Sequence, residues 1–395
     1  MSTPYAVIVD AVRSPMGKGK PGGALSQVHP VDLLATVLEA LLDRTGVDPG
    51  RVDDVLVGCV GQNGEQSANV GRQAWLAAGF PTQVPATTIE RKCGSSQQAV
   101  DFAVQGVRAG AYDIVIAAGV ESMSRVPMGS GRQGADVFGP RVRARFPVLA
   151  PQGVSAELVA QKWGFTRRQL DQFSVESHTR SAHTASCGGF DREIVPIELA
   201  DRRIVAVDET IRPGTTLERL AGLQPVFGTE QYRSQFPEIE WKVTAGNSSQ
   251  LTDGASALLI MSEQVADELS LTPRARVVGS AVVGDDPLLM LTGPIPATQK
   301  VLERTGIALD ELAAVEVNEA FAPVPLAWLA EFPIDPMLLN PRGGAIALGH
   351  PLGASGTRIM TTMINHLEQT GGRFGLQTMC EAGGMANATL LESLA

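Results

Sequence analysis

The chain has 395 residues, of which 44% are hydrophobic, and it carries a net charge of −10. This length suggests two or three domains with large buried cores, and the acidic balance excludes general nucleic-acid binding, which needs a basic face. No apolar run approaches the ~18 residues that span a membrane, and no basic segment precedes an apolar run at the N-terminus, so we expect neither a membrane anchor nor a signal peptide.

In chain order, the first part of the sequence alternates predicted strands with predicted helices. A strand is expected in YAVIVDAVRSP, and a helix in VDLLATVLEALLDRTG that stops at a Thr-Gly pair and is followed by an apolar strand ending at residue 57. Residues 93–119 then predict a glycine- and serine-rich loop, a helix and a buried strand. Such alternation is typical of an α/β fold with largely parallel, buried sheets.

The C-terminal part repeats this plan. Residues 42–57 and 302–317 align without a gap at an offset of 260, and residues 353–380 have the same order of loop, helix and strand as residues 93–119. A duplication into two β/α halves explains this, and chance likeness of two helix–strand units is the alternative. We therefore expect an N-terminal domain over 1–270 and a C-terminal domain over 271–395.

Residues 121–250 differ from both halves. They are rich in Arg, Gly and Pro and contain short helical runs such as SAELVAQKWG. This composition indicates an inserted loop domain carried by the first half, and insertions on rigid scaffolds often contact ligands.

Cys93 is the first candidate for chemistry. It lies in TTIERKCGSSQQAVDF, where a β-prone run gives way to small residues and then to a helix. A thiol at a helix N-terminus is expected to have a lowered pKa, which favours a nucleophile. An inert buried cysteine is the alternative.

The other cysteines carry weaker signals. Cys380 ends a buried strand in LQTMCEAGG, where a core position is the better explanation when the residue is taken alone. Neither Cys59 nor Cys187 has a basic partner nearby in sequence, which favours a structural role for both. The four cysteines form no CxxC pair, so we expect reduced thiols and neither a disulfide framework nor a metal site.

His350 is distinguished from the other four histidines by its surroundings, because it lies in the glycine-rich stretch GGAIALGHPLGASG. Two possible nucleophiles, Cys93 and Cys380, together with one possible base, His350, suit covalent acyl chemistry. Asn318 and Glu319 end the second copy of the repeated strand, a usual place for site residues in α/β folds. A solvated or capping carboxylate is the alternative for Glu319.

At these residues the chain resembles the thiolase family over essentially its whole length. The resemblance is carried by CGSSQQA, which contains Cys93, by VTAGNSSQLTDGAS (243–256), by VNEAF (317–321), and by GGAIALGHPLGASG followed by MCEAGG. It implies the thiolase fold, in which two duplicated β/α halves form a layered αβαβα core with an inserted loop domain.

The resemblance also implies an activity: thiolysis of 3-ketoacyl-CoA to acetyl-CoA and a shortened acyl-CoA, or the reverse Claisen condensation. Cys93 would be the acylated nucleophile, and His350 would take its proton and polarise the substrate oxygen with a water held by Asn318. Cys380 would be the second acid/base. The backbone N–H groups of Cys93 and Ala382 would form an oxyanion hole.

Two further residues are assigned by the same resemblance. Ser249 matches a serine near the pantetheine chain, and Gln152 stands where short-chain members tend to carry a methionine within His-Met-Gly. Ala382 replaces the usual glycine. The Gln152 difference argues against a dedicated acetoacetyl-CoA enzyme, but an acetyl-CoA acetyltransferase stays open, as does a catalytically silent acyl-CoA-binding homologue. Retention of Cys93, His350, Asn318 and Cys380 argues against the silent form.

The expected partners follow from this activity. We expect acyl-CoA and CoA as substrates, with no other cofactor and no metal. We also expect a cytoplasmic protein that binds neither nucleic acid nor membrane. Its expected assembly is a homodimer or homotetramer.

Overall fold

Ten strands form one mixed sheet within residues 5–395, the part of the chain that the computed structural model describes. They are β1 (Ala6–Arg13), β2 (Gly17–Lys18), β3 (Asp54–Gly58), β4 (Ala86–Ile89), β5 (Ile114–Ser122), β8 (Thr252–Ser262), β9 (Ala275–Gly284), β10 (Leu312–Val317), β11 (Phe374–Glu381) and β12 (Met385–Ser393). Their order is β10-β11-β12-β9-β1-β8-β5-β3-β4, and β2 pairs with β8 outside this path.

Helices cover the sheet and connect its strands. They are α1 (Pro30–Thr45), α2 (Val70–Ala77), α3 (Ser95–Arg108), α4 (Gly139–Arg145), α5 (Gln152–Lys162), α6 (Arg167–Ser186), α7 (Leu217–Ala221), α8 (Glu230–Gln235), α9 (Glu263–Glu268), α10 (Pro294–Thr305), α11 (Pro323–Glu331), α12 (Ala345–Leu348) and α13 (Ser355–Thr370). No helix within residues 5–395 combines the length and the apolar character needed to cross a membrane.

The duplication predicted from the sequence is confirmed by the strand order. β4-β3-β5-β8-β1 and β10-β11-β12-β9 repeat one plan, in which β1, β3, β5 and β8 correspond to β9, β10, β11 and β12. The Thr-Gly stops are equivalent too. α1 ends at Gly46 (φ 66°) and α10 at Gly306 (φ 69°), left-handed conformations that glycine adopts without a steric penalty.

The expectation of largely parallel sheets is wrong. Only β3–β4, β3–β5 and β10–β11 are parallel among the ladders of this sheet in residues 5–395, and the others are antiparallel. β11 and β12 are joined by the short turn 382–384, in which Gly383 and Gly384 have positive φ. A turn this short can return the chain only in the antiparallel direction.

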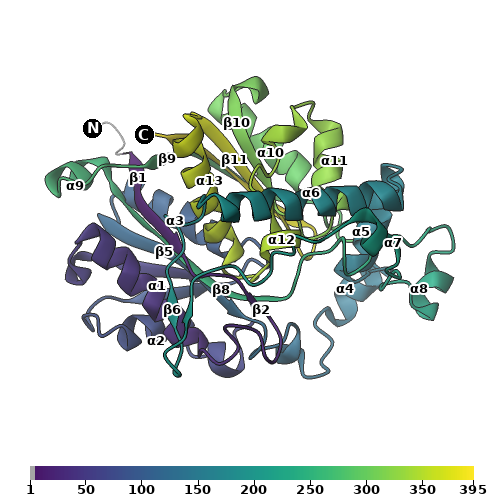
Figure 1. Ribbon diagram of the computed structural model, residues 1–395, viewed down its shortest axis with the longest axis horizontal. Coiled ribbons are helices and arrows are strands. Elements are labelled where there is room, and N and C mark those ends of the chain that lie inside the picture. Colours follow the sequence, from purple (N-terminus) through teal and green to yellow (C-terminus); the bar gives the residue numbers. More distant parts are fainter. Residues whose placement is uncertain (1–4) are drawn as a thin grey trace.

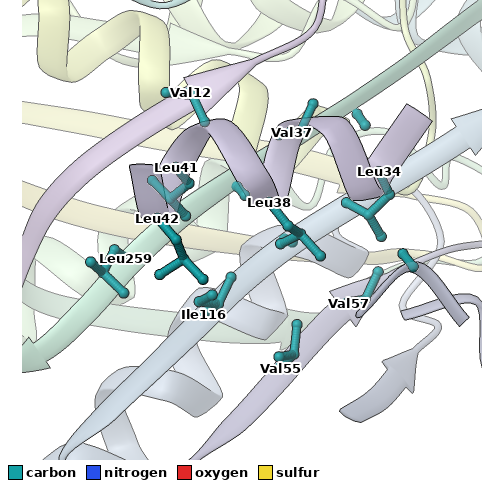
Figure 2. Close-up of a cluster of buried hydrophobic side chains, with 14 of the residues drawn as sticks. Val12, Leu34, Val37, Leu38, Leu41, Leu42, Val55, Val57, Ile116 and Leu259 are labelled. Atoms are coloured by element: carbon teal, nitrogen blue, oxygen red, sulfur yellow. The ribbon is translucent and has the colours of Figure 1, made fainter. Parts of the chain in front are cut away.

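The elements stack in five layers (Figure 1). We call β4-β3-β5-β8-β1 the first half-sheet and β10-β11-β12-β9 the second. α1 and α2 cover the outer face of the first half-sheet, and α10 and α11 cover the outer face of the second. α3 and α13 lie between the two half-sheets. Figure 2 shows how the leucines of α1 meet the first half-sheet. The residues in contact include Leu34, Leu38, Leu41, Leu42, Val55, Ile116 and Leu259.

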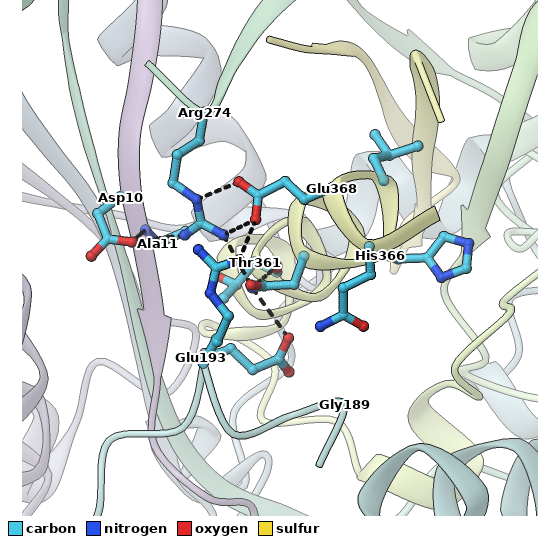
Figure 3. Close-up of polar contacts among 12 residues, drawn as sticks. Asp10, Ala11, Gly189, Glu193, Arg274, Thr361, His366 and Glu368 are labelled. Atoms are coloured by element: carbon cyan, nitrogen blue, oxygen red, sulfur yellow. Dashed lines mark hydrogen bonds and ion pairs between the residues drawn. The ribbon is translucent and has the colours of Figure 1, made fainter. Parts of the chain in front are cut away.

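An ion-pair network joins the two halves where β1 meets β9. Arg274, just before β9, donates to Asp10 of β1 at 2.7 Å and to Glu368 of α13 at 2.6 Å (Figure 3). All three side chains are about nine-tenths buried. Because a buried charge that loses its partner is costly, this network ties α13 to the centre of the sheet.

Residues 123–251 separate the neighbouring strands β5 and β8 and contain α4 to α8. α5 and α6 pack on the second half rather than the first: α5 and α11 share one apolar cluster, and Ser181 of α6 donates to the carbonyl of Arg342, just before α12. The insertion therefore reaches over the second half, and its helices come close to the residues described next.

Candidate active site

Cys93 lies in a tight turn between β4 and α3. The turn places Lys92 at φ 47°, a conformation that is uncommon outside glycine. The Ser95 hydroxyl fastens it by donating to the Lys92 carbonyl at 2.5 Å and accepting from the Arg91 N–H at 2.9 Å. Cys93 itself is buried and stands one residue before Gly94, the N-cap of α3.

His350 follows α12 in a loop whose backbone is held from two sides. Its N–H donates to the carbonyl of Gln250 at 3.1 Å and to the Thr252 hydroxyl at 3.0 Å. Gly349 has φ 86°, and a β-carbon there would lie 2.2 Å from the Thr252 hydroxyl oxygen. The glycine is required both for this conformation and for this close approach.

Ser355 fixes the protonation of the buried imidazole. Its hydroxyl donates to the carbonyl of Pro351 at 2.9 Å and lies 2.6 Å from His350 Nδ1. With the hydroxyl proton directed to Pro351, Nδ1 is the protonated nitrogen and donates to the serine oxygen. Nε2 then carries the lone pair, and Asn318 Nδ2 lies 3.4 Å from it. The imidazole is presented as a base.

Burial and the nearby Arg358 guanidinium lower the pKa of His350 to about 3. The side chain is therefore neutral at any pH above that value. Asn318 directly follows β10, and its Oδ1 is a buried acceptor with no hydrogen-bond partner within residues 5–395. An acceptor in this state suits a water molecule at the imidazole.

The two cysteines are close enough to influence each other. Cys380 lies on β11 and is fully buried, and burial raises its pKa well above the ordinary value, helped by the charges of Cys93 and Glu381. Burial, and after it Glu381, raises the pKa of the Cys93 thiol to about 12. The expected lowering by the helix N-terminus is wrong for this site, because desolvation outweighs it.

A neutral thiol needs a base before it can attack a carbonyl. His350 as that base stays a prediction, and its loop comes close, since Leu352 packs against the apolar cluster that contains Cys93. Gln152 and the Cys93 N–H lower the pKa of the thiol. Cys59 and Cys187 are free thiols outside this arrangement. Cys59 accepts from Gln66, and Cys187 is exposed at the end of α6.

Comparison with known proteins decides the family. A model of the thiolase N-terminal domain matches residues 6–264, and a model of the thiolase C-terminal domain matches residues 271–393. The chain belongs to the thiolase family. It is an acyltransferase, and it has the thiolase fold that the resemblance implied.

Individual thiolases are similar over nearly their whole length. A steroid 3-ketoacyl-CoA thiolase of Mycobacterium tuberculosis is 45% identical, over 98% of this chain and 94% of the relative. A 3-ketoacyl-CoA thiolase of Aliivibrio fischeri is 43% identical over 98% of each chain. The crystal structure of an acetyl-CoA acetyltransferase of Bacillus anthracis superposes with a TM-score of 0.88 at 38% identity, covering 99% of each chain.

The remaining predicted residues of this thiolase lie around the same centre. Gln152 begins α5 close to the Cys93 thiol, as its effect on the pKa there indicates. Ser249 is half-buried, and its N–H donates to the carbonyl of Ala320 in the VNEAF motif at 2.9 Å. Both residues thus connect the insertion and the following loop to the catalytic motifs.

Ala382 opens the turn after Cys380. Its φ is not positive, unlike those of Gly383 and Gly384 (φ 93° and 75°), so alanine is tolerated there without strain. Position 382 therefore does not need the family's glycine for its conformation. The role of the Ala382 N–H in an oxyanion hole stays a prediction.

Two buried carboxylates hold the catalytic loops in place, and one of them escaped sequence reasoning. Glu319 accepts from Ser177, Asn340 and the Ile346 N–H at 2.6–3.1 Å, so the solvated alternative for it is wrong. Glu121 of β5 was not singled out. It accepts from the N–H of Gly353, 232 residues away, and no sequence pattern signals such a contact.

The role of Ser355 can be tested in this thiolase. Ser355→Ala leaves the Nδ1 proton of His350 without an acceptor, and a buried unpaired donor costs about 1–3 kcal/mol. We expect kcat/KM to fall roughly 10- to 100-fold. Ser355→Thr, which keeps the hydroxyl, should restore most of the activity.

Thr361→Val is the matched control, since it removes another buried hydroxyl of α13 that bonds only within its helix. Steady-state thiolysis is the measurement. Equal losses in Ser355→Ala and Thr361→Val would show that the serine supports the helix and not the imidazole.

Proposed function

We propose that this thiolase cleaves 3-ketoacyl-CoA with CoA, giving acetyl-CoA and a shortened acyl-CoA through an acyl-Cys93 intermediate. One observation carries the proposal: two buried thiols influence each other, and Leu352, two residues after the buried imidazole of His350, packs against the apolar cluster that contains Cys93. This set supplies a nucleophile, its base and a second acid/base.

In the first half-reaction His350 Nε2 takes the proton of Cys93, and the thiolate attacks the 3-keto carbon. The bond between C2 and C3 breaks as the tetrahedral intermediate collapses. The electron pair passes to C2 as the enolate of acetyl-CoA, and Cys380 protonates it. The shortened acyl group stays on Cys93 as a thioester. His350 can deliver a hydrogen bond to the carbonyl oxygen only while it carries the proton taken from Cys93.

In the second half-reaction Cys380, now a thiolate, takes the proton of the incoming CoA thiol. The CoA sulfur attacks the acyl-Cys93 thioester, and the thiol of Cys93 re-forms with the proton held by His350. Charge on the carbonyl oxygen would be met by fixed donors, and we assign these to His350 with a water on Asn318 and to the backbone N–H groups of Cys93 and Ala382. Such donors contribute about 3–4 kcal/mol each.

The substrate class is proposed from the pocket residue and the relatives together. Gln152 lies near the Cys93 thiol, and we expect it to line the pocket for the acyl or pantetheine chain. The relatives named above include thiolases of 3-ketoacyl-CoA and of steroid 3-ketoacyl-CoA. We propose medium, long or bulky acyl chains and a degradative direction. Synthesis of acetoacetyl-CoA is the second candidate, favoured by the likeness to an acetyl-CoA acetyltransferase.

Other features of the function are proposed on the same basis. The chemistry needs no group beyond the named side chains and CoA, and Ser249 would contact the pantetheine chain. We propose a homodimer or homotetramer, in line with the family resemblance. A cytoplasmic location is supported by the four free thiols.

Thiolysis across a series of 3-ketoacyl-CoAs tests the substrate class. The series runs from acetoacetyl-CoA through linear medium and long chains to a polycyclic side chain. Each buried methylene contributes about 1 kcal/mol or more to transition-state binding, so we expect kcat/KM to exceed that for acetoacetyl-CoA by at least roughly tenfold for the favoured chain. A maximum at acetoacetyl-CoA would favour the acetyltransferase, and no turnover on any member would contradict thiolysis.

A further inference from the structure

Two glutamates occupy equivalent positions in the duplicated halves. β3 and β5 pair with Val57 opposite Ala118, and β10 and β11 pair with Val317 opposite Thr378. Each residue of the second pair is 260 positions beyond its counterpart, and so is Glu381 beyond Glu121. Each glutamate also faces the N-terminal end of a central helix, Glu121 near Gly353 before α13 and Glu381 near Gly94 before α3.

The first glutamate is fully supplied with donors. Glu121 accepts from the N–H groups of Val60, Gly61 and Gly353 and from the Gln66 side chain, all at 2.8–2.9 Å. Four donors of this kind can hold a buried carboxylate.

The second glutamate has none of these donors. Glu381 is fully buried, and neither of its carboxyl oxygens has a hydrogen-bond partner within residues 5–395. Its Oε1 lies against the backbone of Gly94, since a β-carbon built there would be 2.0 Å from it. A buried carboxylate without donors is strongly unfavourable, so the group needs a proton.

A partner for that proton lies beside it. Asn387 of β12 also lies against Gly94. Its Nδ2 would be 2.6 Å from a β-carbon built on Gly94, and it donates to the Gly94 carbonyl at 3.1 Å. Its other side-chain atom, Oδ1, is a buried acceptor that lacks a donor in the described part of the chain. An O–H on Glu381 would satisfy both groups.

The charged and titratable groups around Glu381 come from three elements. Arg91 and Glu90 precede α3, Asp101 lies on α3, and the thiols of Cys93 and Cys380 complete the surroundings. Arg91 favours the charged carboxylate, whereas Glu90 and Asp101 disfavour it. Burial has the largest effect, and together these influences raise the pKa of Glu381 to about 8.

We propose that Glu381 is a positioning residue that holds a proton in the working enzyme, donates it in a hydrogen bond to Asn387, and keeps the start of α3 beside Cys93 free of negative charge. This inference rests on the proposed role of Cys93 as the nucleophile. It also explains the difference between the two glutamates: Gly353, 260 positions beyond Cys93, stands beside Glu121 and has no thiol, and there the glutamate ties down a loop.

A pH dependence follows from the charge of Glu381. A carboxyl whose pKa is raised stays neutral up to about that pH and becomes negative above it. The negative form raises the pKa of the Cys93 thiol. Once Glu381 ionises, Cys93 of the wild type should therefore react more slowly than Cys93 of a variant whose side chain at position 381 is permanently neutral.

Alkylation of Cys93 by iodoacetamide tests this, with the modified peptide identified by mass spectrometry between about pH 6 and pH 10. Glu381→Gln is the neutral isostere. Its rate should match that of the wild type below about pH 7 and exceed it roughly 3- to 10-fold above about pH 9. Glu303→Gln is the control, because it removes an exposed charge on α10 that is not among the groups around Glu381, and it should follow the wild type.

Parallel rates for the wild type and Glu381→Gln over the whole range would overturn the proposal, as would a constant advantage of Glu381→Gln already present at pH 6. If Glu381→Gln fails to fold, infrared spectroscopy of the wild type gives the answer. A protonated carboxyl band at neutral pH that disappears at alkaline pH and shifts in Asn387→Leu supports the proposal. The absence of such a band refutes the proposal. Alkylation needs no turnover, so failure to acylate Cys93 with 3-ketoacyl-CoA would contradict the proposed function separately.

Discussion

We expect Cys93→Ala to abolish acylation of the enzyme and to lower thiolysis by at least about 10⁴-fold, the scale seen when a covalent nucleophile is removed. The physical reason is that Cys93 is the proposed acyl carrier, so that without its sulfur no thioester can form at this position. Intact-mass analysis after addition of acyl-CoA, followed by peptide mapping, is the measurement.

Cys187→Ala is the matched control, because Cys187 is exposed and lies outside the site. This variant should acylate at the wild-type rate and extent. An adduct that persists in Cys93→Ala and maps to Cys380 or Cys59 would show that the nucleophile has been assigned to the wrong residue.

Cys380→Ala separates acylation from turnover. With acetyl-CoA as donor, Cys93 should still take up one acetyl group, because its base is His350 and not Cys380. Steady-state thiolysis should fall by about 10³-fold, since general acid–base catalysis at C2 and at the CoA thiol contributes roughly 10²–10⁴-fold. Quench-flow mass spectrometry gives the acylation rate, and a coupled assay gives turnover.

The division of labour between the cysteines is contradicted if both alanine variants lose acylation equally. Cys380→Ser offers a second comparison, because a hydroxyl keeps the volume of the thiol but ionises much less readily. It should resemble Cys380→Ala in turnover and the wild type in stability, measured by thermal unfolding.

Short local patterns in the sequence were sufficient to predict where helices and strands begin and end. The Thr-Gly stops at residues 46 and 306, the turn before α3 and the strand before Asn318 are each encoded within a few neighbouring residues, so their positions and the duplication followed from the chain alone. The thiolase motifs likewise brought Cys93 and His350 forward, because each lies within a short run of small residues.

The relative direction of neighbouring strands could not be predicted from such local patterns. The alternation of strands and helices suggested parallel pairing, whereas the turn 382–384 and the insertion between β5 and β8 make most neighbours antiparallel. Sequence order indicates which strands exist, but pairing depends on how each connection travels through space.

The sequence by itself determined the two-fold plan, the nucleophile and base candidates, and the family. Only the tertiary structure decided the protonation of these groups: the neutral state of His350 depends on burial and the nearby Arg358, and that of the Cys93 thiol depends on desolvation. The reason is physical, because a pKa depends on the surroundings of a group in three dimensions. The residues that form those surroundings come from strands and helices far apart in the chain.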